Sequence, residues 1–415
     1  MLDIKYIREN AEEVKKNSEN RGAKVDIDFL LKLDILRREK KTMLEAHQAI
    51  KNKWSKGKPT DESINQSKLE SEIIEKAKKD LEEVEHQYLN LMKKVPNVTH
   101  PDVPMGGEAD FKVLDTKGDS PKFKFEPKDH EELMLALDVL DFERAAKVAS
   151  AKFYYTKNEL VRLDQALINY GLDIIEKHGF TLMETPDLAK DSILEGIGFN
   201  PRGPEAQIYS VENSDLSLIG TSEITLGGYH ANEIVDLSNG PLKYAGISHC
   251  FRTEAGSYGR TSKGLYRVHQ FTKLEMFVYC KPEDSEKIHD ELLAIEREIV
   301  DGLEVPYQVI DTASRDLGAP AYRKFDIEAW MTMKNGYGEI TSTSNCTDYQ
   351  ARRLNTRYRD ENGDTKFVHT LNGTAIVTSR LPIAIFENFQ QKDGSIKIPK
   401  ALQKYTGFKE IKAKK

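Results

Sequence analysis

The sequence predicts an α+β fold, in which a mostly antiparallel β-sheet flanked by helices follows an N-terminal antiparallel coiled-coil hairpin. Heptad-spaced apolar residues predict the hairpin, and short β-rich runs joined by hairpin-length turns predict the sheet. A linker rich in proline and glycine, residues 96–107, separates the two patterns. With 415 residues, the chain is long enough for two or three domains. We therefore expect a helical domain over residues 1–100 and a second domain over residues 101–415.

Two long helices are predicted between residues 29 and 95. On the first, an apolar residue recurs at every seventh position, with Leu33 on the same stripe: Phe29, Leu36, Met43 and Ile50. On the second, two such series alternate at spacings of three and four: Ile74, Ala77, Leu81, Val84, Tyr88, Leu91 and Val95. This spacing is typical of a coiled-coil seam. Between the helices, Gly57 and Pro59 break the helical pattern and allow the chain to reverse.

Basic side chains gather on the first helix and at the tip of the hairpin: Arg37, Arg38, Lys40, Lys41, Lys51, Lys53, Lys56 and Lys58. The ordinary explanation is a solvated face, because long surface helices are rich in charged residues. The alternative is a lever that lays positive charge along a nucleic-acid backbone, although the whole chain has a net charge of -7. Lys40 and His47 fall on the apolar stripe, where polar residues weaken a seam or fix its register.

The composition excludes several classes of protein. Hydrophobic residues make up 39% of the chain, and no apolar run approaches the roughly 18 residues of a membrane span, so we expect a soluble protein that does not enter a membrane. The N-terminus resembles neither a secretory signal nor a transit peptide, which predicts a cytoplasmic location. Cys250, Cys280 and Cys346 lie far apart, which argues against a disulfide framework or a structural zinc site and predicts reduced, structural cysteines.

After the linker the pattern changes. Residues 129–177 read mainly as helices, and β-rich runs follow at residues 180–184, 242–247, 273–279 and 330–333. Turns of hairpin length between several of these runs favour an antiparallel sheet over a doubly wound parallel fold. The chain has neither of the glycine-rich phosphate loops, G-x-G-x-x-G after a strand or G-x-x-x-x-G-K-[ST], so nucleotide chemistry would need another cradle.

The stretch that carries most chemistry consists of residues 251–254, a loop rich in glycine and arginine, and residues 267–275. Strand alternation places Arg252 and Glu254 on one face of the first strand. One face of the returning strand carries a residue of interest at every second position: Arg267, His269, Phe271, Lys273 and Glu275. Unpaired buried charge is costly, so this face is better explained as a binding site than as core. Arginines bind phosphate or carboxylate oxygens, and an aromatic ring can stack on a purine.

This stretch resembles motif 2 of the class II aminoacyl-tRNA synthetases, in the form seen in seryl-tRNA synthetases. Residues 179–186 resemble the strand-and-proline end of motif 1, which in that family lies at the dimer interface, and residues 371–380 resemble motif 3. The resemblance extends to residues 221–223, 339–345 and 348–353, and with the helical hairpin it covers nearly the whole chain in the family's order. Ala375 and Ser379 depart from the glycines of many relatives, although small residues still fit.

The resemblance implies a class II synthetase fold and an ATP-dependent, AMP-forming serine–tRNA ligase. Such an enzyme activates L-serine to seryl-adenylate and transfers the seryl group to the 3'-terminal adenosine of tRNA(Ser), and the expectation extends to tRNA(Sec). The implied cofactors are ATP and Mg2+. The implied partners are tRNA, bound by the N-terminal domain, and a second copy of the chain in a homodimer, with no DNA and no membrane.

The resemblance also implies a role for individual residues. Those expected to bind ATP are Arg252, Glu254, Arg267, Phe271, Glu339, Ser342 and Arg380. Those expected to bind serine are Thr221, Glu223, Arg252, Glu275 and Thr374. Those expected to hold Mg2+ are Glu339 and Ser342, and those expected to bind tRNA are Arg37, Arg38, Lys41, Lys51 and Lys53. Arg252 and Arg380 are the expected catalytic residues. Arg252 would meet the α-phosphate and the serine carboxylate. Phe271 would stack beneath the adenine, with Arg380 above it and reaching toward the γ-phosphate, and Arg267 would meet the outer phosphates.

Other interpretations of these patterns differ in what they expect of particular residues. His269 is better explained as a hydrogen-bonded structural residue than as a catalytic one, because the expected reaction needs no general base. One rival function is a ligase that hands a small amino acid to a carrier protein, which has less need of a long helical arm. Another is a non-catalytic RNA-binding paralogue, against which the intact Arg252, Glu275 and Arg380 argue.

Overall fold

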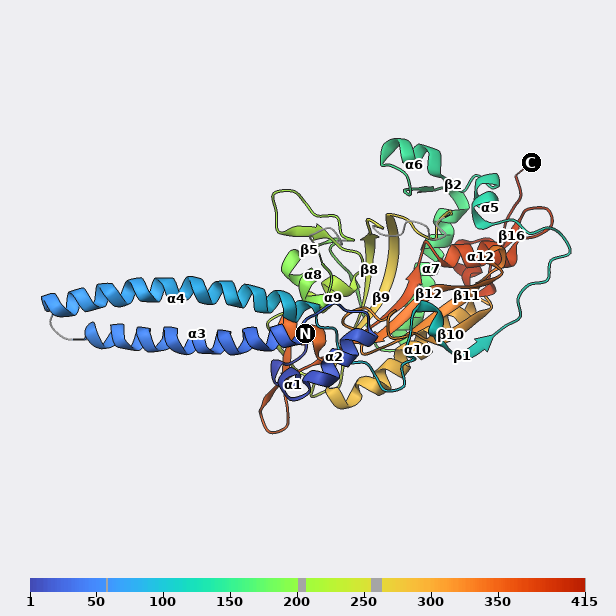
Figure 1. Cartoon of the computed structure of the whole chain (residues 1–415). Coiled ribbons are helices and arrows are strands. Elements are labelled where there is room, and N and C mark those ends of the chain that lie inside the picture. Colours follow the sequence, from blue (N-terminus) through green and yellow to red (C-terminus); the bar gives the residue numbers. More distant parts are fainter. Residues whose placement is uncertain (57–58, 201–206, 255–262, 415) are drawn as a thin grey trace. The chain divides into compact units, whose positions relative to one another are not determined.

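A computed structural model describes residues 1–56, 59–200, 207–254 and 263–414 of the chain (Figure 1). Gly57 and Lys58, from the predicted reversal, lie outside the described residues, as does most of the loop rich in glycine and arginine after residue 254. By its internal contacts the chain divides into two compact units, Met1–Val98 and Thr99–Lys415. Among the described residues, no helix is both long enough and apolar enough to cross a membrane.

The first unit is helical throughout. Its helices are α1 (Ile4–Glu9), α2 (Ala11–Asn20), α3 (Ile27–Trp54) and α4 (Asp61–Lys94). Polar side chains cap the two long helices where they begin: Asp26 accepts the Phe29 N–H, and Thr60 and Ser63 form a capping box. The helices α3 and α4 run antiparallel and side by side (Figure 1), so the predicted coiled-coil hairpin is confirmed.

The seam of this hairpin follows the predicted registers on α4 but not the predicted heptad series on α3. Ile74 and Leu81 of α4 are buried as predicted. On α3 the predicted series is wrong, because its members are 38% to 47% exposed: Phe29, Leu36, Met43 and Ile50. The series that begins at buried Leu33 faces the partner helix instead, and it continues through Lys40 and His47.

Polar residues in the seam explain why the heptad series predicted for α3 is wrong. Lys40 lies 3.2 Å from Asp80, and Nδ1 of His47 lies 2.8 Å from Glu70. These contacts cross between the helices and fix their register, as one of the two readings of Lys40 and His47 predicted. Because a heptad count follows apolar residues alone, it selected the exposed series and missed a seam in which charged pairs replace apolar contacts.

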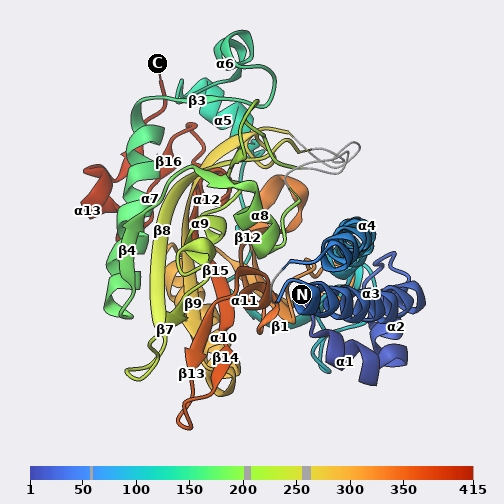
Figure 2. The same ribbon diagram turned by 90° about the vertical axis from the view of Figure 1, so that its left-hand side faces the viewer.

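The second unit is built on an eight-stranded sheet whose strand order is β1-β10-β11-β12-β15-β9-β8-β4. All neighbours pair antiparallel except β4 and β8, which confirms the predicted sheet class. The strands are β1 (Lys112–Lys117), β4 (Thr181–Glu184), β8 (Leu242–Phe251), β9 (Gln270–Cys280), β10 (Tyr307–Asp311), β11 (Arg323–Met331), β12 (Gly336–Asn345) and β15 (His369–Val377). Figure 2 shows the long strands β8, β9 and β15 side by side.

Helices flank this sheet. They are α5 (His130–Ala136), α6 (Phe142–Val148), α7 (Asn158–Lys177), α8 (Asp191–Ile197), α9 (Glu223–Gly228), α10 (Ser285–Gly302), α11 (Tyr349–Leu354), α12 (Leu381–Phe389) and α13 (Gln403–Thr406). Short strands form smaller sheets around the main one: β2 (Leu140–Asp141), β3 (Tyr155–Thr156), β5 (Leu188–Lys190), β6 (Leu216–Leu218), β7 (Ile234–Val235), β13 (Arg357–Arg359), β14 (Thr365–Phe367), β16 (Ile396–Lys397) and β17 (Glu410–Ile411).

Three of the four predicted β-rich runs are strands, and the fourth is wrong in part. The runs at 180–184, 242–247 and 273–279 correspond to β4, β8 and β9. The run at 330–333 is divided, because β11 ends at Met331 and Thr332–Lys334 form a 3-10 turn, η3, into β12. Asn335 follows with a φ of 46°, a left-handed conformation that Asn tolerates and that turns the chain back on itself.

The two faces of the sheet have different roles. On β9, Leu274 and Met276 point into the main core, which also holds the buried apolar residues of α7 and α10. Gly171 of α7 approaches β15 so closely that a Cβ there would lie 2.7 Å from Cγ1 of Ile376. The alternate positions Phe271, Lys273 and Glu275 point the other way, toward the polar cavity described next.

Candidate functional site

A cavity lies on the polar face of β9, β12 and β15. It is lined by Arg252, Glu254, Tyr266, Arg267, Val268, Phe271, Lys273, Glu339, Ile340, Thr341, Ser342, Thr374, Val377, Ser379 and Arg380. The lining includes every residue that the sequence predicts to bind ATP, together with Thr374 from the predicted serine set. Residues spread over more than 120 positions of the sequence are therefore brought to one place by the sheet.

Arg252 and Phe271 form one wall of the cavity. The Arg252 guanidinium carbon lies 5.3 Å from the centre of the Phe271 ring, and Nε of Arg252 donates to the Gly220 carbonyl at 3.2 Å. The backbone N–H of Arg252 donates to His269 O at 3.0 Å. A fixed cation beside an aromatic ring that lines the same cavity can bind an anionic group attached to a flat base.

The predicted strand alternation at this wall is wrong beyond the strand ends. The strand β8 ends at Phe251 and β9 begins at Gln270, so Arg252, Glu254, Arg267 and His269 lie outside both strands. Glu254 adopts a φ of 51°, which bends the chain, and its carboxylate lies 3.2 Å from Nη1 of Arg267. A bend and an ion pair thus bring these two side chains to the cavity. The sequence analysis had instead expected alternation along a strand to place them there.

His269 is held by hydrogen bonding and packing. Its Nδ1 lies 2.8 Å from the Arg252 carbonyl oxygen, and its ring centre lies 5.2 Å from that of Phe153. His269 is therefore hydrogen-bonded, as predicted. The three cysteines are buried free thiols, as the sequence predicts.

Arg380 and Glu339 form the opposite wall. Arg380 immediately precedes α12, and its Nη1 lies 3.1 Å from Oε2 of Glu339 and donates to the Glu339 carbonyl at 3.0 Å. Burial by itself would raise the pKa of Glu339, but the charges of Arg380 and Lys324 outweigh burial and hold that pKa at about 2. Glu339 is therefore ionised at neutral pH.

Tyr266 is part of this wall and was missed by the sequence analysis. The Arg380 guanidinium carbon lies 4.8 Å from the centre of the Tyr266 ring, whereas the guanidinium beside Phe271 is that of Arg252. Tyr266 ends the loop rich in glycine and arginine, and an aromatic residue next to Arg267 was the one available signal.

A β-bulge brings Glu339 and Ser342 to the same face of β12. Residues three apart on a regular strand point to opposite faces. Here Thr341 pairs with Ile327 and Glu339 pairs with Glu328, so Ile340 is an extra residue. Ser342 pairs with Asp326, two residues from Glu328, and the two oxygen-bearing side chains consequently share one face.

A buried polar cluster adjoins the cavity at the strands β9 and β15. Nζ of Lys273 lies 2.6 Å from Oε2 of Glu275 and donates to Oγ1 of Thr221 at 3.1 Å. Oγ1 of Thr374 donates to the same Glu275 oxygen at 3.2 Å. Lys273 thus connects Thr221 with Glu275, which Thr374 contacts directly. Lys273 was not among the predicted site residues, although it lies between Phe271 and Glu275 on one strand face.

Glu223 extends the cluster and has a shifted pKa. Its Oε1 accepts hydrogen bonds from Gln350 Nε2 at 2.8 Å and from Asn372 Nδ2 at 3.0 Å. Burial and then the negative charge of Glu275 raise the pKa of Glu223 to about 7. The site therefore contains a carboxyl group that titrates near neutral pH and that a bound cation would ionise.

The basic residues predicted to bind tRNA all lie on α3, in the first unit. Arg38, Lys41 and Lys53 are exposed, and Lys51 is half-buried. Arg37 packs its guanidinium carbon 4.5 Å from the centre of the Tyr88 ring and lies 3.4 Å from Asp34, contacts that stabilise the hairpin itself.

Both units match known protein families. Residues 1–99 match the family described as the seryl-tRNA synthetase N-terminal domain, and residues 208–389 match the class II tRNA synthetase core domain (G, H, P, S and T). The chain is 54% identical to a serine–tRNA ligase of Treponema denticola over 99% of this chain and all of the relative. It is 52% identical to the serine–tRNA ligase of Dictyoglomus turgidum over the full length of both chains.

Solved structures agree with this relationship. The seryl-tRNA synthetase from Pyrococcus horikoshii complexed with ATP is 41% identical, with a TM-score of 0.90 over 100% of both chains. The cytoplasmic serine–tRNA ligase from Naegleria fowleri in complex with AMP is 31% identical, with a TM-score of 0.85 over 100% of this chain and 99% of that one. The sequence motifs, the sheet and the full-length identities agree, and the chain belongs to the seryl-tRNA synthetase family.

Proposed function

We propose that the chain is a serine–tRNA ligase, which activates L-serine with ATP and transfers the seryl group to the 3'-terminal adenosine of tRNA(Ser). One observation supports this more than any other: a single cavity is lined by Arg252, Arg267, Arg380 and the Phe271 ring, and it adjoins the buried cluster around Glu275. The relatives, which match over almost their whole length, carry the same activity in their names. The same reaction with tRNA(Sec) is part of the proposal.

The first step joins serine to AMP. An oxygen of the serine carboxylate attacks the α-phosphorus of ATP, the bond from that phosphorus to the bridging oxygen breaks, and pyrophosphate leaves. The barrier comes largely from repulsion between anions and from the cost of aligning them. Arg252 would bind the α-phosphate and the serine carboxylate together, whereas Arg267 and Arg380 would neutralise the outer phosphates.

The buried cluster would recognise serine itself. Glu223 would receive the serine ammonium, and Glu275 with Thr374 would bond the serine hydroxyl. Phe271 and Glu254 would hold the adenine. In the second step the terminal ribose hydroxyl of the tRNA attacks the adenylate carbonyl and AMP leaves.

Mg2+ fits the residues that the resemblance assigned to it. Mg2+ prefers oxygen ligands and takes them from one or two carboxylates together with substrate phosphates. The ionised Glu339 and the Ser342 hydroxyl share one face of β12 in the cavity, owing to the bulge at Ile340. When bound there, the ion would neutralise phosphate charge; Glu339 and Ser342 would hold it, with phosphate oxygens as the other ligands.

The remaining parts of the proposal concern partners and location. The helical arm would bind the body of the tRNA through Arg38, Lys41, Lys51 and Lys53, with Arg37 at its base, because phosphate contacts need positive charge. A homodimer is proposed from the likeness of residues 179–186 to motif 1, and β4 within them is an edge strand of the main sheet. We propose a cytoplasmic location, where tRNA is charged.

The amino acid that is charged provides the most direct test. Purified protein is expected to load a tRNA pool with serine and to reject alanine by about 10⁴-fold, because alanine would leave the buried hydroxyl-binding groups unpaired. Aminoacylation with radiolabelled serine, threonine, alanine and cysteine, measured as kcat/KM, checks this. Equal charging of alanine and serine, or transfer to a carrier protein in place of tRNA, would contradict the proposal.

The raised pKa of Glu223 predicts how serine binding depends on pH. Below about pH 7 Glu223 is protonated and must lose its proton before it can pair with an ammonium. The KM for serine is therefore expected to fall by about tenfold from about pH 6 to about pH 8, and Glu223→Gln should remove this slope. The KM for ATP serves as the control, since Glu339 stays ionised over this range. A KM for serine that does not change with pH in the unaltered protein would refute the role of Glu223.

A further inference from the structure

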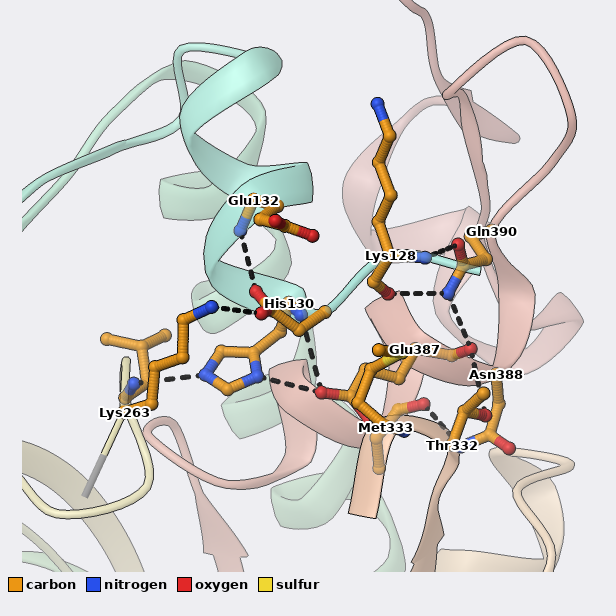
Figure 3. Close-up of polar contacts among 12 residues, drawn as sticks. Lys128, His130, Glu132, Lys263, Thr332, Met333, Glu387, Asn388 and Gln390 are labelled. Atoms are coloured by element: carbon orange, nitrogen blue, oxygen red, sulfur yellow. Dashed lines mark hydrogen bonds and ion pairs between the residues drawn. The ribbon is translucent and has the colours of Figure 1, made fainter. Parts of the chain in front are cut away.

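A buried histidine–glutamate pair lies next to the cavity but does not line it. His130, the first residue of α5, is 6% exposed, and Glu387 of α12 is 3% exposed. Nδ1 of His130 lies 2.8 Å from Oε1 of Glu387, and Figure 3 shows that further contacts converge on the same two side chains. The two residues are 257 positions apart in the sequence, and neither belongs to the reaction scheme above.

The contacts of His130 determine which nitrogen carries its proton. The backbone N–H of Leu265 donates to Nε2 of His130 at 3.2 Å, so Nε2 is an acceptor and the proton is on Nδ1. Nδ1–H then donates to Glu387. The Glu387 carboxylate also accepts the backbone N–H of His130 at 3.3 Å and that of Met333 at 3.2 Å. Every donor in this group has an acceptor, and both ring nitrogens are used.

Gly264 allows the turn before Leu265 to lie directly against the imidazole. Its φ is +63°, a left-handed conformation that favours glycine. A Cβ at this position would lie 2.1 Å from Nε2 of His130, which is far inside van der Waals contact. The turn is thus positioned against the histidine both by a hydrogen bond and by close packing.

Each segment joined by this pair also carries residues of the cavity wall. Leu265 directly precedes Tyr266 and Arg267. Glu387 is on α12, which begins one residue after Arg380. Met333 is in the turn η3, which leads into β12 and Glu339. These segments meet again at the cavity, where Arg380 contacts both Tyr266 and Glu339.

We propose that His130, oriented by Glu387, is a positioning residue for ATP. It accepts the Leu265 N–H and so holds the turn that places Tyr266 against Arg380 and Arg267 beside Glu254, where the triphosphate would bind. This inference rests on the proposed function, because it assigns the nucleotide to that cavity. It predicts that damage to the His130–Leu265 contact weakens ATP binding and leaves serine binding unchanged.

Two substitutions at His130 separate its two hydrogen bonds. The side-chain amide of Asn lies about where Nδ1 of His130 lies. His130→Asn therefore keeps a donor for Glu387 and loses the acceptor for the Leu265 N–H. In Gln, the terminal atoms reach the position of Nε2, so His130→Gln keeps that acceptor. In serine-dependent ATP–pyrophosphate exchange, His130→Asn is expected to raise the KM for ATP about tenfold, because it leaves a buried N–H unsatisfied. The KM for serine should stay within about twofold, and His130→Gln should restore much of the KM for ATP.

Gly264→Ala tests the same contact from the opposite side and retains both His130 and Glu387, because the added Cβ would push the turn and the imidazole apart. It should also raise the KM for ATP and not that for serine, which keeps the inference testable if His130→Asn fails to fold. The matched control is His178→Asn, because His178 and Glu298 form a pair of the same kind and length, 2.8 Å, at the surface. This control should behave as the unaltered protein does.

The possible outcomes distinguish this inference from the proposed function. Equal KM values for ATP in His130→Asn, Gly264→Ala and the unaltered protein would overturn the positioning role alone. The positioning role would also be overturned if the variants raised the KM for ATP and the KM for serine equally. It would be overturned too if His130→Gln raised the KM for ATP as much as His130→Asn does. Absence of exchange in the unaltered protein would contradict the proposed function; equilibrium titration with Mg–ATP would then still compare ATP binding by the variants and test the role of His130.

Discussion

Replacement of Arg252 by Ala is expected to reduce serine-dependent ATP–pyrophosphate exchange by about 10³-fold or more, because one preorganised cation that meets charge developing in the transition state has an effect of this order. Arg252 is already held in place by its bond to Gly220 O and by the Phe271 ring, so little reorganisation is needed when substrate binds. The measurement is kcat and KM for both substrates, since loss of one shared clamp should affect ATP and serine together.

A surface arginine provides the control for this variant. Arg144 forms an ion pair with Asp141 three residues away, has a highly exposed side chain and does not line the cavity. Arg144→Ala should exchange pyrophosphate at the normal rate. Exchange by Arg252→Ala within a few fold of normal would show that the α-phosphate and the carboxylate are bound elsewhere, and the assigned role would have to be abandoned.

Shortening the helical arm is expected to separate the two half-reactions. A variant that lacks residues 41–79 and joins Lys40 to Asp80 through a short Gly–Ser turn keeps the buried base of the hairpin, including Leu30, Leu33 and Tyr88. It loses Lys41, Lys51 and Lys53, and kcat/KM for tRNA should fall by about 10²-fold or more, since each phosphate contact adds to affinity. Pyrophosphate exchange should remain within about twofold, because the cavity is formed by residues 252–380 of the second unit.

Salt dependence gives this experiment a second readout. If lysines on the arm neutralise phosphates, the dependence of tRNA binding on salt concentration should become shallower in the shortened variant. Equal loss of pyrophosphate exchange and of tRNA charging would instead indicate that the arm supports the fold of the enzyme. An unchanged kcat/KM for tRNA would show that the basic residues of α3 form a solvated surface and do not bind tRNA.

Much of the fold could be predicted from the sequence because it depends on local patterns. Runs of residues that favour strands marked β8 and β9, and heptad spacing marked α4, since both signals follow from local backbone geometry. The ordered motifs around Arg252, Glu275 and Arg380 identified the family. A pattern that depends on a single strand or helix can be recognised in the sequence alone. The predictions of the fold class and of the family were confirmed.

Errors arose where a second element determines the outcome. The register of α3 was wrong at Phe29 and Leu36, because its seam depends on the pairs that Lys40 and His47 make with α4. Lys273 was passed over as a site residue because its role depends on Glu275 beside it and on Thr221 from a different segment. Tyr266 was missed because only the turn at Gly264 and Leu265 brings its ring next to the Arg380 guanidinium.

The sequence by itself thus determined the class of the fold, the order of its motifs and the set of charged and aromatic residues available for chemistry. Only the tertiary structure decided how those residues meet. One extra residue at Ile340 turns Glu339 and Ser342 to the same face, and His130 and Glu387 pair across more than half of the chain. The physical reason is that backbone periodicity is a local property, whereas a bulge, a buried ion pair or a shifted pKa depends on which distant segment packs alongside.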